Sequence, residues 1–371
     1  MAKLRTSICD RLGIRLPIIQ APMAGGATTP DLVAAVCEAG ALGSFGFAYT
    51  QPEAMQREAE AVRARTRAPF NLNLFAAPLP GAIDPAAQRG AIGAVAAYYA
   101  ELGLPAPQPV EPPFAPDYDA QFAVIEAVRP PVFTFHLGEL GEKRLKHLKA
   151  LGVTVGGSAT CVAEAKRLEA LGVDFIVAQG AEAGGHRGTY LRDPYDAMTG
   201  TFALTRLVVR AVAKTPVVAA GGIMDGAGIA AVLALGAQAA QMGTAFIPCA
   251  ETGLPAAYKQ RVLDAEEDET LITEKFSGKP ARGIANRFMR EMRARNAPQL
   301  AFPAQNSLMG PLRAAAAKAG KIDLVALWAG QAAPLARARC PQRSSSRRSP
   351  LRPRKCSSAS PRCGHNGHAS H

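Results

Sequence analysis

Residues 173–188 read Val-Asp-Phe-Ile-Val-Ala-Gln-Gly-Ala-Glu-Ala-Gly-Gly-His-Arg-Gly, and they carry the clearest indication of the fold. The apolar run at 173–177 predicts a buried strand. The loop after it combines Gln179, two adjacent glycines and His186. Glycines let backbone N–H groups approach an anion or a flat ring, and an imidazole can move a proton near neutral pH. The stretch therefore predicts a ligand site at the carboxyl end of a strand.

The same pattern of an apolar strand followed by small residues recurs twice downstream. Residues 216–226 read PVVAAGGIMDG, and residues 239–244 read AAQMGT. Three strand ends of this kind in succession predict that a phosphate-bearing cofactor lies across them.

Apolar segments of strand length recur along the chain, and helical patterns separate them. Thr29 or Thr28 is predicted to cap one of these helices, with Pro30 in its first turn, as is typical of a helix start. Apolar strands that alternate with helices predict a parallel sheet covered on both faces. Eight such units favour an α/β fold of the closed (β/α)8 TIM-barrel type over an open sheet. The predicted strands are 17–22, 41–46, 69–75, 132–137, 154–159, 175–180, 217–222 and 239–244.

Two segments are too long to be simple connections in such a barrel. Residues 76–130 are rich in Pro and Ala and are predicted to form a lid with two helices. Residues 247–310 are predicted to form a small helical lid domain. Residues 1–246 and 311–336 then make up the barrel. Both insertions begin at carboxyl ends of strands, where a barrel builds its active site.

The formal net charge of +12 is concentrated at one end of the 371-residue chain. Residues 337–371 contain eight Arg and one Lys without Asp or Glu, which leaves +3 for the rest. A body with so little charge is not predicted to bind nucleic acid. The tail has no hydrophobic periodicity and is predicted to be disordered. A frameshifted end is favoured over a basic binding arm. Its Cys and His residues match none of the usual zinc spacings, so no metal site is predicted.

No apolar run of about 18 residues is present, so no membrane span is predicted. The first residues, MAKLRTSICDRLGI, lack the apolar core of a signal peptide, which favours a cytoplasmic location. A homodimer is a candidate assembly.

Two histidines are candidates for proton transfer. His186 lies between glycines and has no apolar sequence neighbours to pack against, which favours catalysis over a structural role. His136 ends a predicted strand, where contact with a substrate and a structural role are equally compatible with the sequence.

Glycines and buried amides at the strand ends have two readings each. The glycines after the last two strands match the phosphate position of this fold, although glycine also punctuates ordinary helix–strand connections. Asn73 and Gln179 are strand amides that need partners, either along the edge of a flat cofactor ring or on neighbouring backbone. The chain has no GxGxxG after its first strand and no GxxxxGK[ST], so a Rossmann site and a P-loop are not predicted.

Five segments together are similar to the nitronate monooxygenase family, formerly called 2-nitropropane dioxygenase, in its bacterial class. The similarity covers about residues 8–336, and the tail from residue 337 departs from the family pattern. The segments are LPIIQAPMAGG at 16–26, FNLNLF at 70–75, GSATCVAEAKRLEALGVDFIVAQGAEAGGHRG at 157–188, PVVAAGGIMDGAGIAAVLALGAQAAQMGTAF at 216–246 and FSGKPARGIANRF at 276–288.

The resemblance implies a non-covalent FMN and the oxidation of alkyl nitronates, such as propionate 3-nitronate, by O2 to a carbonyl compound and nitrite. It implies that His186 is catalytic, either as the base for a neutral nitroalkane or as the group that orients the anionic nitronate. The implied FMN contacts are Ala21, Pro22, Met23, Asn73, Gln179, Gly184 and Gly185, with Gly221, Gly222, Gln241, Met242, Gly243 and Thr244 around the phosphate.

Two alternatives remain open at this point. An FMN-dependent enoyl-acyl-carrier-protein reductase resembles the chain in the same barrel and the same AGGH loop, and it would require NADH. The other alternative is a nucleic-acid-binding protein, in which a basic tail is attached to a barrel that has no catalytic activity. Anaerobic mixing with NADH separates the first alternative from the nitronate oxidation, and removal of the tail separates the second.

Overall fold

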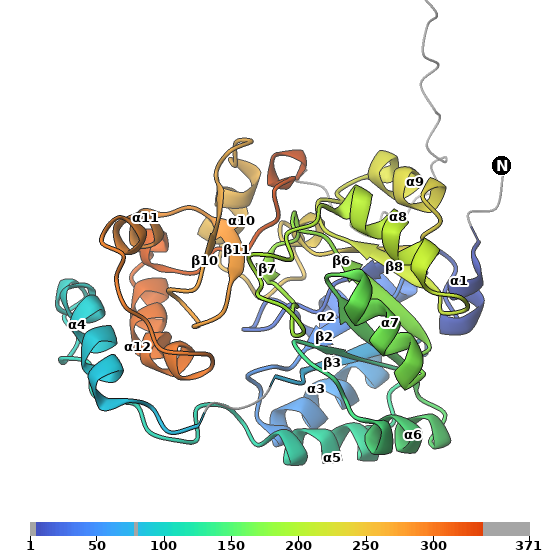
Figure 1. Cartoon of the computed structure of the whole chain (residues 1–371), viewed down its shortest axis with the longest axis horizontal. Coiled ribbons are helices and arrows are strands. Elements are labelled where there is room, and N and C mark those ends of the chain that lie inside the picture. The colour runs from blue at the N-terminus through green and yellow to red at the C-terminus, as the bar shows by residue number, and fades with distance from the viewer. Residues whose placement is uncertain (1–4, 78–80, 337–371) are drawn as a thin grey trace, which may run out of the picture. The chain divides into compact units, whose positions relative to one another are not determined.

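The computed structural model describes residues 5–77 and 81–336. The predicted disordered tail lies outside these residues. Eight parallel strands form one sheet in the order β1-β9-β8-β6-β5-β4-β3-β2. A further parallel bridge between Ile19 and Leu42 joins its two ends, so the sheet closes into a barrel (Figure 1). The predicted (β/α)8 barrel is confirmed. Its strands are β1 Ile18–Gln20, β2 Gly43–Gly46, β3 Phe70–Phe75, β4 Val132–His136, β5 Thr154–Ala159, β6 Phe175–Gln179, β8 Val217–Ala220 and β9 Ala239–Met242.

Apolar side chains explain why these segments form the inner layer. The first four residues of β4 are buried, as is every residue of β6 and β8. The covering helices bury their apolar faces against the strands, and Phe122 and Ile125 of α5 belong to the same core cluster as Phe133 of β4. The helices of the barrel are α1 Ser7–Leu12, α2 Pro30–Glu38, α3 Pro52–Arg65, α5 Tyr118–Val128, α6 Glu142–Ala150, α7 Val162–Leu171, α8 Thr201–Ala211 and α9 Gly226–Ala234.

The predicted cap of α2 is confirmed. The Thr29 hydroxyl accepts a hydrogen bond from the Leu32 N–H at 3.1 Å, and Pro30 occupies the first turn. This arrangement satisfies one of the N–H groups that a helix start leaves without a partner.

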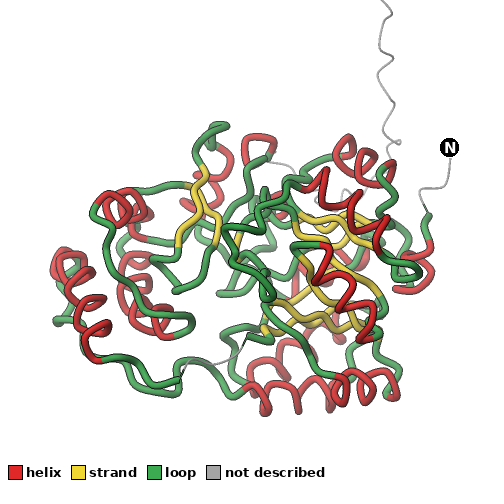
Figure 2. Tube along the Cα trace, viewed as in Figure 1, coloured by secondary structure: helices red, strands yellow, loops and turns green. Residues whose placement is uncertain are grey.

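A second layer lies beside the carboxyl ends of the barrel strands. It contains a three-stranded antiparallel sheet in the order β10-β11-β7, which is separate from the barrel strands in Figure 2. The strands are β7 Gly185–His186, β10 Thr270–Thr273 and β11 Ala281–Ile284. The helices of this layer are α4 Pro85–Glu101, α10 Ala256–Leu263, α11 Arg287–Ala294 and α12 Ala304–Lys318. None of the helices among the described residues is long and apolar enough to cross a membrane.

The second layer corrects three expectations about the insertions. The segment 247–310 is not purely helical, because it contains β10 and β11. The predicted boundary before residue 311 is wrong, because α12 runs through it. Gly310 and Pro311 suggest a helix end, yet the helix continues to Lys318. The segment 76–130 also does not act as one lid. Its first helix, α4, packs on α11 and α12, whereas α5 covers the barrel.

Candidate functional site

A cavity of about 640 Å³ lies between the carboxyl ends of the barrel strands and the second layer. This volume is typical of ligand sites. The wall that the second layer contributes includes Ser277, Arg313 and Trp328. Nine of the predicted site residues line it: Ala21, Pro22, Met23, Asn73, His136, Gly184, Gly185, His186 and Gly243. Gln179, Gly221, Gly222, Gln241, Met242 and Thr244 are not among the residues that line it.

The backbone of His186 is held from several directions. Strand β7 pairs with β11, with His186 opposite Ala281. The carbonyl of His186 accepts hydrogen bonds from Nε2 of His136 at 3.1 Å and from Nε2 of Gln179 at 2.9 Å. The guanidinium of Arg187 is buried and donates to the carbonyls of Thr160, Gln179 and Ala197. These bonds fix the loop that follows β6 and set the direction of the His186 ring.

The amide of Gln179 bonds within this loop through both of its polar atoms. Its Oε1 accepts from the Gly188 N–H at 2.8 Å, while its Nε2 donates to the His186 carbonyl. These bonds match the reading in which the amide bonds to neighbouring backbone, and its contact with a cofactor ring stays a prediction.

Asn73 differs from Gln179 because it lines the cavity. Its Nδ2 donates to the carbonyl of Thr134 at 3.1 Å and to the Thr134 hydroxyl at 2.9 Å. Its Oδ1 accepts no hydrogen bond among the described residues, so this oxygen is available to a ligand.

The ring of His186 lies among aromatic side chains that come from distant parts of the chain. Its centroid is 5.6 Å from that of Phe75, 5.8 Å from that of Phe302 and 5.8 Å from that of Trp328. The expectation that His186 has no apolar neighbours is wrong, because these rings come from other elements. They keep water away from one side of the imidazole.

Ser277 anchors the ring of His186. The Ser277 hydroxyl lies 2.9 Å from Nε2 of His186 and 3.1 Å from the Lys279 carbonyl oxygen. Depending on the tautomer of the imidazole, Nε2 donates to this hydroxyl or accepts from it. In either tautomer the contact fixes the orientation of the ring.

Both histidines are neutral at physiological pH. Burial lowers the pKa of His186 to about 3, and the positive charges of Lys279 and Arg313 act in the same direction. Burial likewise lowers the pKa of His136 to about 4, against the hydrogen bond to the His186 carbonyl. A neutral imidazole can accept a proton, whereas an imidazolium cannot.

The turns after β8 and β9 form a cradle of backbone donors. The N–H groups of Gly221, Gly222, Gly243 and Thr244 have no acceptor among the described residues. Gly221 and Gly222 have φ values of +117° and +67°, which favour glycine. Free N–H groups in such turns bind anions. The cradle therefore fits a phosphate, and the oxygen of Asn73 and the glycines of the 184–185 turn fit a flat polar ring.

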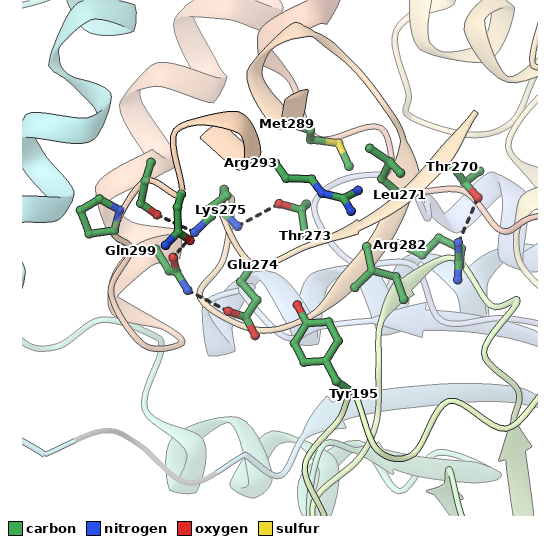
Figure 3. A pocket seen from close by; sticks show the side chains of 14 residues that line it. Tyr195, Thr270, Leu271, Thr273, Glu274, Lys275, Arg282, Met289, Arg293 and Gln299 are labelled. Atoms are coloured by element: carbon green, nitrogen blue, oxygen red, sulfur yellow. Dashed lines mark hydrogen bonds between the residues drawn. The ribbon is translucent and has the colours of Figure 1, made fainter. Parts of the chain in front are cut away.

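A second cavity of about 770 Å³ lies in the second layer and contains none of the predicted site residues (Figure 3). Several of its polar side chains bond to one another or to the backbone. Lys275 donates to the Ala297 carbonyl at 2.5 Å, Gln299 donates to Glu274 at 2.7 Å, and Arg282 donates to Thr270 at 3.1 Å. We do not assign a function to it.

Several residues of the main cavity, the one of about 640 Å³ that contains His186, and of the aromatic rings around His186 were not predicted. Ser277 belongs to the FSGKPARG stretch, which the sequence analysis assigned to a lid and to the family resemblance but not to the site. Arg313 and Phe302 carry no local motif, and Trp328 was noted only as the single tryptophan. For Ser277, the signal in the sequence was a serine next to a glycine in a segment predicted to cover the site.

Comparisons with known proteins agree with one another. A family model described as nitronate monooxygenase matches residues 6–342. A nitronate monooxygenase from Paraburkholderia phytofirmans is 43% identical over 90% of this chain and 91% of its own. One from Pseudomonas aeruginosa is 42% identical over 88% of this chain and 93% of its own.

Solved structures extend this similarity. Nitroalkane oxidase from Streptomyces ansochromogenes has a TM-score of 0.82 and 41% identity, covering 89% of this chain and 93% of its own. FabK from Thermotoga maritima has a TM-score of 0.68 and 31% identity, covering 90% of each chain.

Proposed function

Because the chain belongs to the nitronate monooxygenase family, we propose that it uses bound FMN and O2 to oxidise alkyl nitronates, such as propionate 3-nitronate, to a carbonyl compound and nitrite. The family is flavin-dependent, and its members are oxidoreductases. The observation that carries the proposal is His186, held by its backbone at the edge of a cavity beside a phosphate cradle. The cytoplasmic location and the homodimer remain predictions.

The residues present fit an FMN whose ring lies in this cavity and whose phosphate reaches the turns after β8 and β9, of which Gly243 lines the cavity. Gly221, Gly222, Gly243 and Thr244 would hold the phosphate through their free N–H groups. The flat ring would lie against Met23, Asn73 and the 184–185 turn, with Ala21 and Pro22 nearby. When bound, the flavin supplies the electron transfer that the oxidation requires.

The protein contributes position and proton transfer. In a neutral nitroalkane, the unprotonated ring nitrogen of His186 would accept the proton from the carbon that bears the nitro group. For a nitronate that is already ionised, the same ring would orient the anion. Ser277 holds the ring, and His136 and Gln179 hold the carbonyl of His186. Phe75, Phe302 and Trp328 limit the access of water to this face.

Oxygen uptake tests the proposed function. Purified protein with propionate 3-nitronate should consume O2 and release nitrite, and its flavin should not be bleached rapidly by NADH under anaerobic conditions. Rapid bleaching by NADH without nitronate oxidation would instead favour the enoyl-acyl-carrier-protein reductase.

The bound flavin is expected to be FMN and not FAD. The turns after β8 and β9 provide one phosphate cradle, and among the described residues of the cavity we identify no second cradle for a diphosphate. Heat denaturation should therefore release FMN, identified by chromatography against both standards. Release of FAD would contradict the assignment.

A further inference from the structure

Among the described residues that line the main cavity, Arg313 is the one charged side chain. The two histidines that line it, His136 and His186, are neutral. Arg313 projects from α12, in the layer opposite the barrel. The described lining residues include no Asp or Glu. A single positive charge in a wall that is otherwise neutral favours an anionic ligand.

The guanidinium of Arg313 has few partners within the protein. One nitrogen, Nη2, donates to Oδ1 of Asn306 at 2.7 Å and to its carbonyl at 3.3 Å. Its Nε is buried and has no hydrogen-bond partner. No ion pair of Arg313 occurs among the described residues. Tyr49, which lines the same cavity, does not neutralise it, because burial raises the pKa of this phenol to about 12.

Arg313 is partly buried, and its charge has no carboxylate partner there, so a ligand that brings a carboxylate would be stabilised by pairing with it. Arginine suits this role because its planar fork can bind both oxygens of a carboxylate.

Arg313 and the phosphate cradle belong to different layers of the structure. The cradle lies on the turns after β8 and β9, whereas Arg313 comes from α12. Phe75 contacts Tyr49 at a centroid distance of 6.0 Å and His186 at 5.6 Å. A substrate that extends along Phe75 would present one end to His186 and the other to the wall that carries Arg313.

We propose that Arg313 determines substrate specificity by pairing with a carboxylate at the end of the substrate distant from the nitronate. The proposal rests on the proposed function, since it concerns the same cavity. Pairing with Arg313 would make propionate 3-nitronate a better substrate than propyl-1-nitronate, in which a methyl group replaces the carboxylate.

The test compares these two nitronates on the wild-type protein, Arg313→Gln, Arg313→Lys and the control Arg290→Gln. Arg290 is exposed on α11 and does not line the cavity. In Arg313→Gln, kcat/KM for propionate 3-nitronate should fall roughly 10- to 100-fold, as expected for a lost hydrogen bond between charged groups. The value for propyl-1-nitronate should change less than about threefold. Arg313→Lys should retain part of the preference, and Arg290→Gln should retain all of it.

Binding provides a readout that is independent of turnover. The flavin absorbance of each protein is titrated with butanoate and with butanamide, which lack a nitro group and are not oxidised. The wild-type protein should bind the carboxylate-bearing compound more tightly, and Arg313→Gln should remove the difference. Equal losses on both nitronates, or a changed FMN content, would show that Arg313 serves the reacting group or the cofactor and would overturn the proposal. An unchanged preference would overturn it as well. If neither nitronate is oxidised by the wild-type protein, the proposed function fails, while the titration still tests Arg313.

Discussion

Replacement of His186 by asparagine is expected to lower the oxidation of a neutral nitroalkane by roughly 10²- to 10⁴-fold, the usual contribution of a positioned general base. In the wild-type protein the neutral imidazole of His186 has one unprotonated ring nitrogen, and the contact with Ser277 holds the ring in place. Asparagine has no nitrogen that takes up a proton. A nitronate prepared in advance needs no deprotonation, so its oxidation should fall much less. Steady-state oxygen uptake with nitroethane and with ethyl nitronate measures both effects.

Comparing two substrates on one variant removes differences in flavin content. His186→Asn should keep its FMN, because the cradle after β8 and β9 does not include this side chain. Equal losses on both substrates would show that His186 binds or orients without acting as a base. No loss on either would shift the role to His136, whose ring also lines the cavity.

The pH dependence provides a separate expectation about the same ring. Burial lowers the pKa of His186 to about 3, so the imidazole remains unprotonated well below its ordinary range. A base is active while unprotonated, and its activity is lost only as the pH falls through its own pKa. The kcat/KM for a neutral nitroalkane should therefore show no acid limb near pH 6.5. The low pKa would be contradicted if kcat/KM of the wild-type protein fell as the pH dropped through 6.5 and if His186→Asn abolished this fall.

The barrel could be predicted from the sequence because its evidence is local. Each strand is an apolar run, and β5 begins and ends at the predicted residues while the others differ by one or two. The glycines that follow β8 and β9 and the loop that carries His186 are also local signals. A periodic pattern shows which face of a segment is buried.

The same pattern does not show which distant segment covers that face, and this limits the prediction of the site. Ser277 lies 91 residues from His186 in the sequence, yet their side chains are 2.9 Å apart. Trp328 and Phe302 reach the same ring from the second layer. Gln179 could be recognised as a buried amide, but its bonds to the His186 carbonyl and the Gly188 N–H depend on how the loop folds back.

Replacement of Gly184 by alanine is expected to weaken FMN binding by roughly 10- to 100-fold, or to prevent it, with a loss of stability of about 1–3 kcal/mol from overpacking. A Cβ at this position would lie 2.6 Å from the carbonyl carbon of Ala329 and 2.6 Å from the nitrogen of Gly330. Both are backbone atoms, so no flexible side chain can move aside. Relief requires that the 184–185 turn moves away from residues 329–330.

That movement would disturb both ends of the cofactor site at once. The Gly330 N–H donates to the Thr244 hydroxyl at 2.9 Å, and the Gln331 N–H donates to the Glu182 carbonyl at 2.9 Å. Residues 330–331 therefore connect the loop of His186 to the turn after β9 that carries the phosphate cradle. Gly226→Ala is the matched control, because a Cβ there meets nothing within 4 Å and alanine favours a helix. Flavin absorbance per protein and the thermal unfolding midpoint measure the outcome. If Gly184→Ala retained its full flavin content and its midpoint, the close packing of this turn would not be what positions the ring.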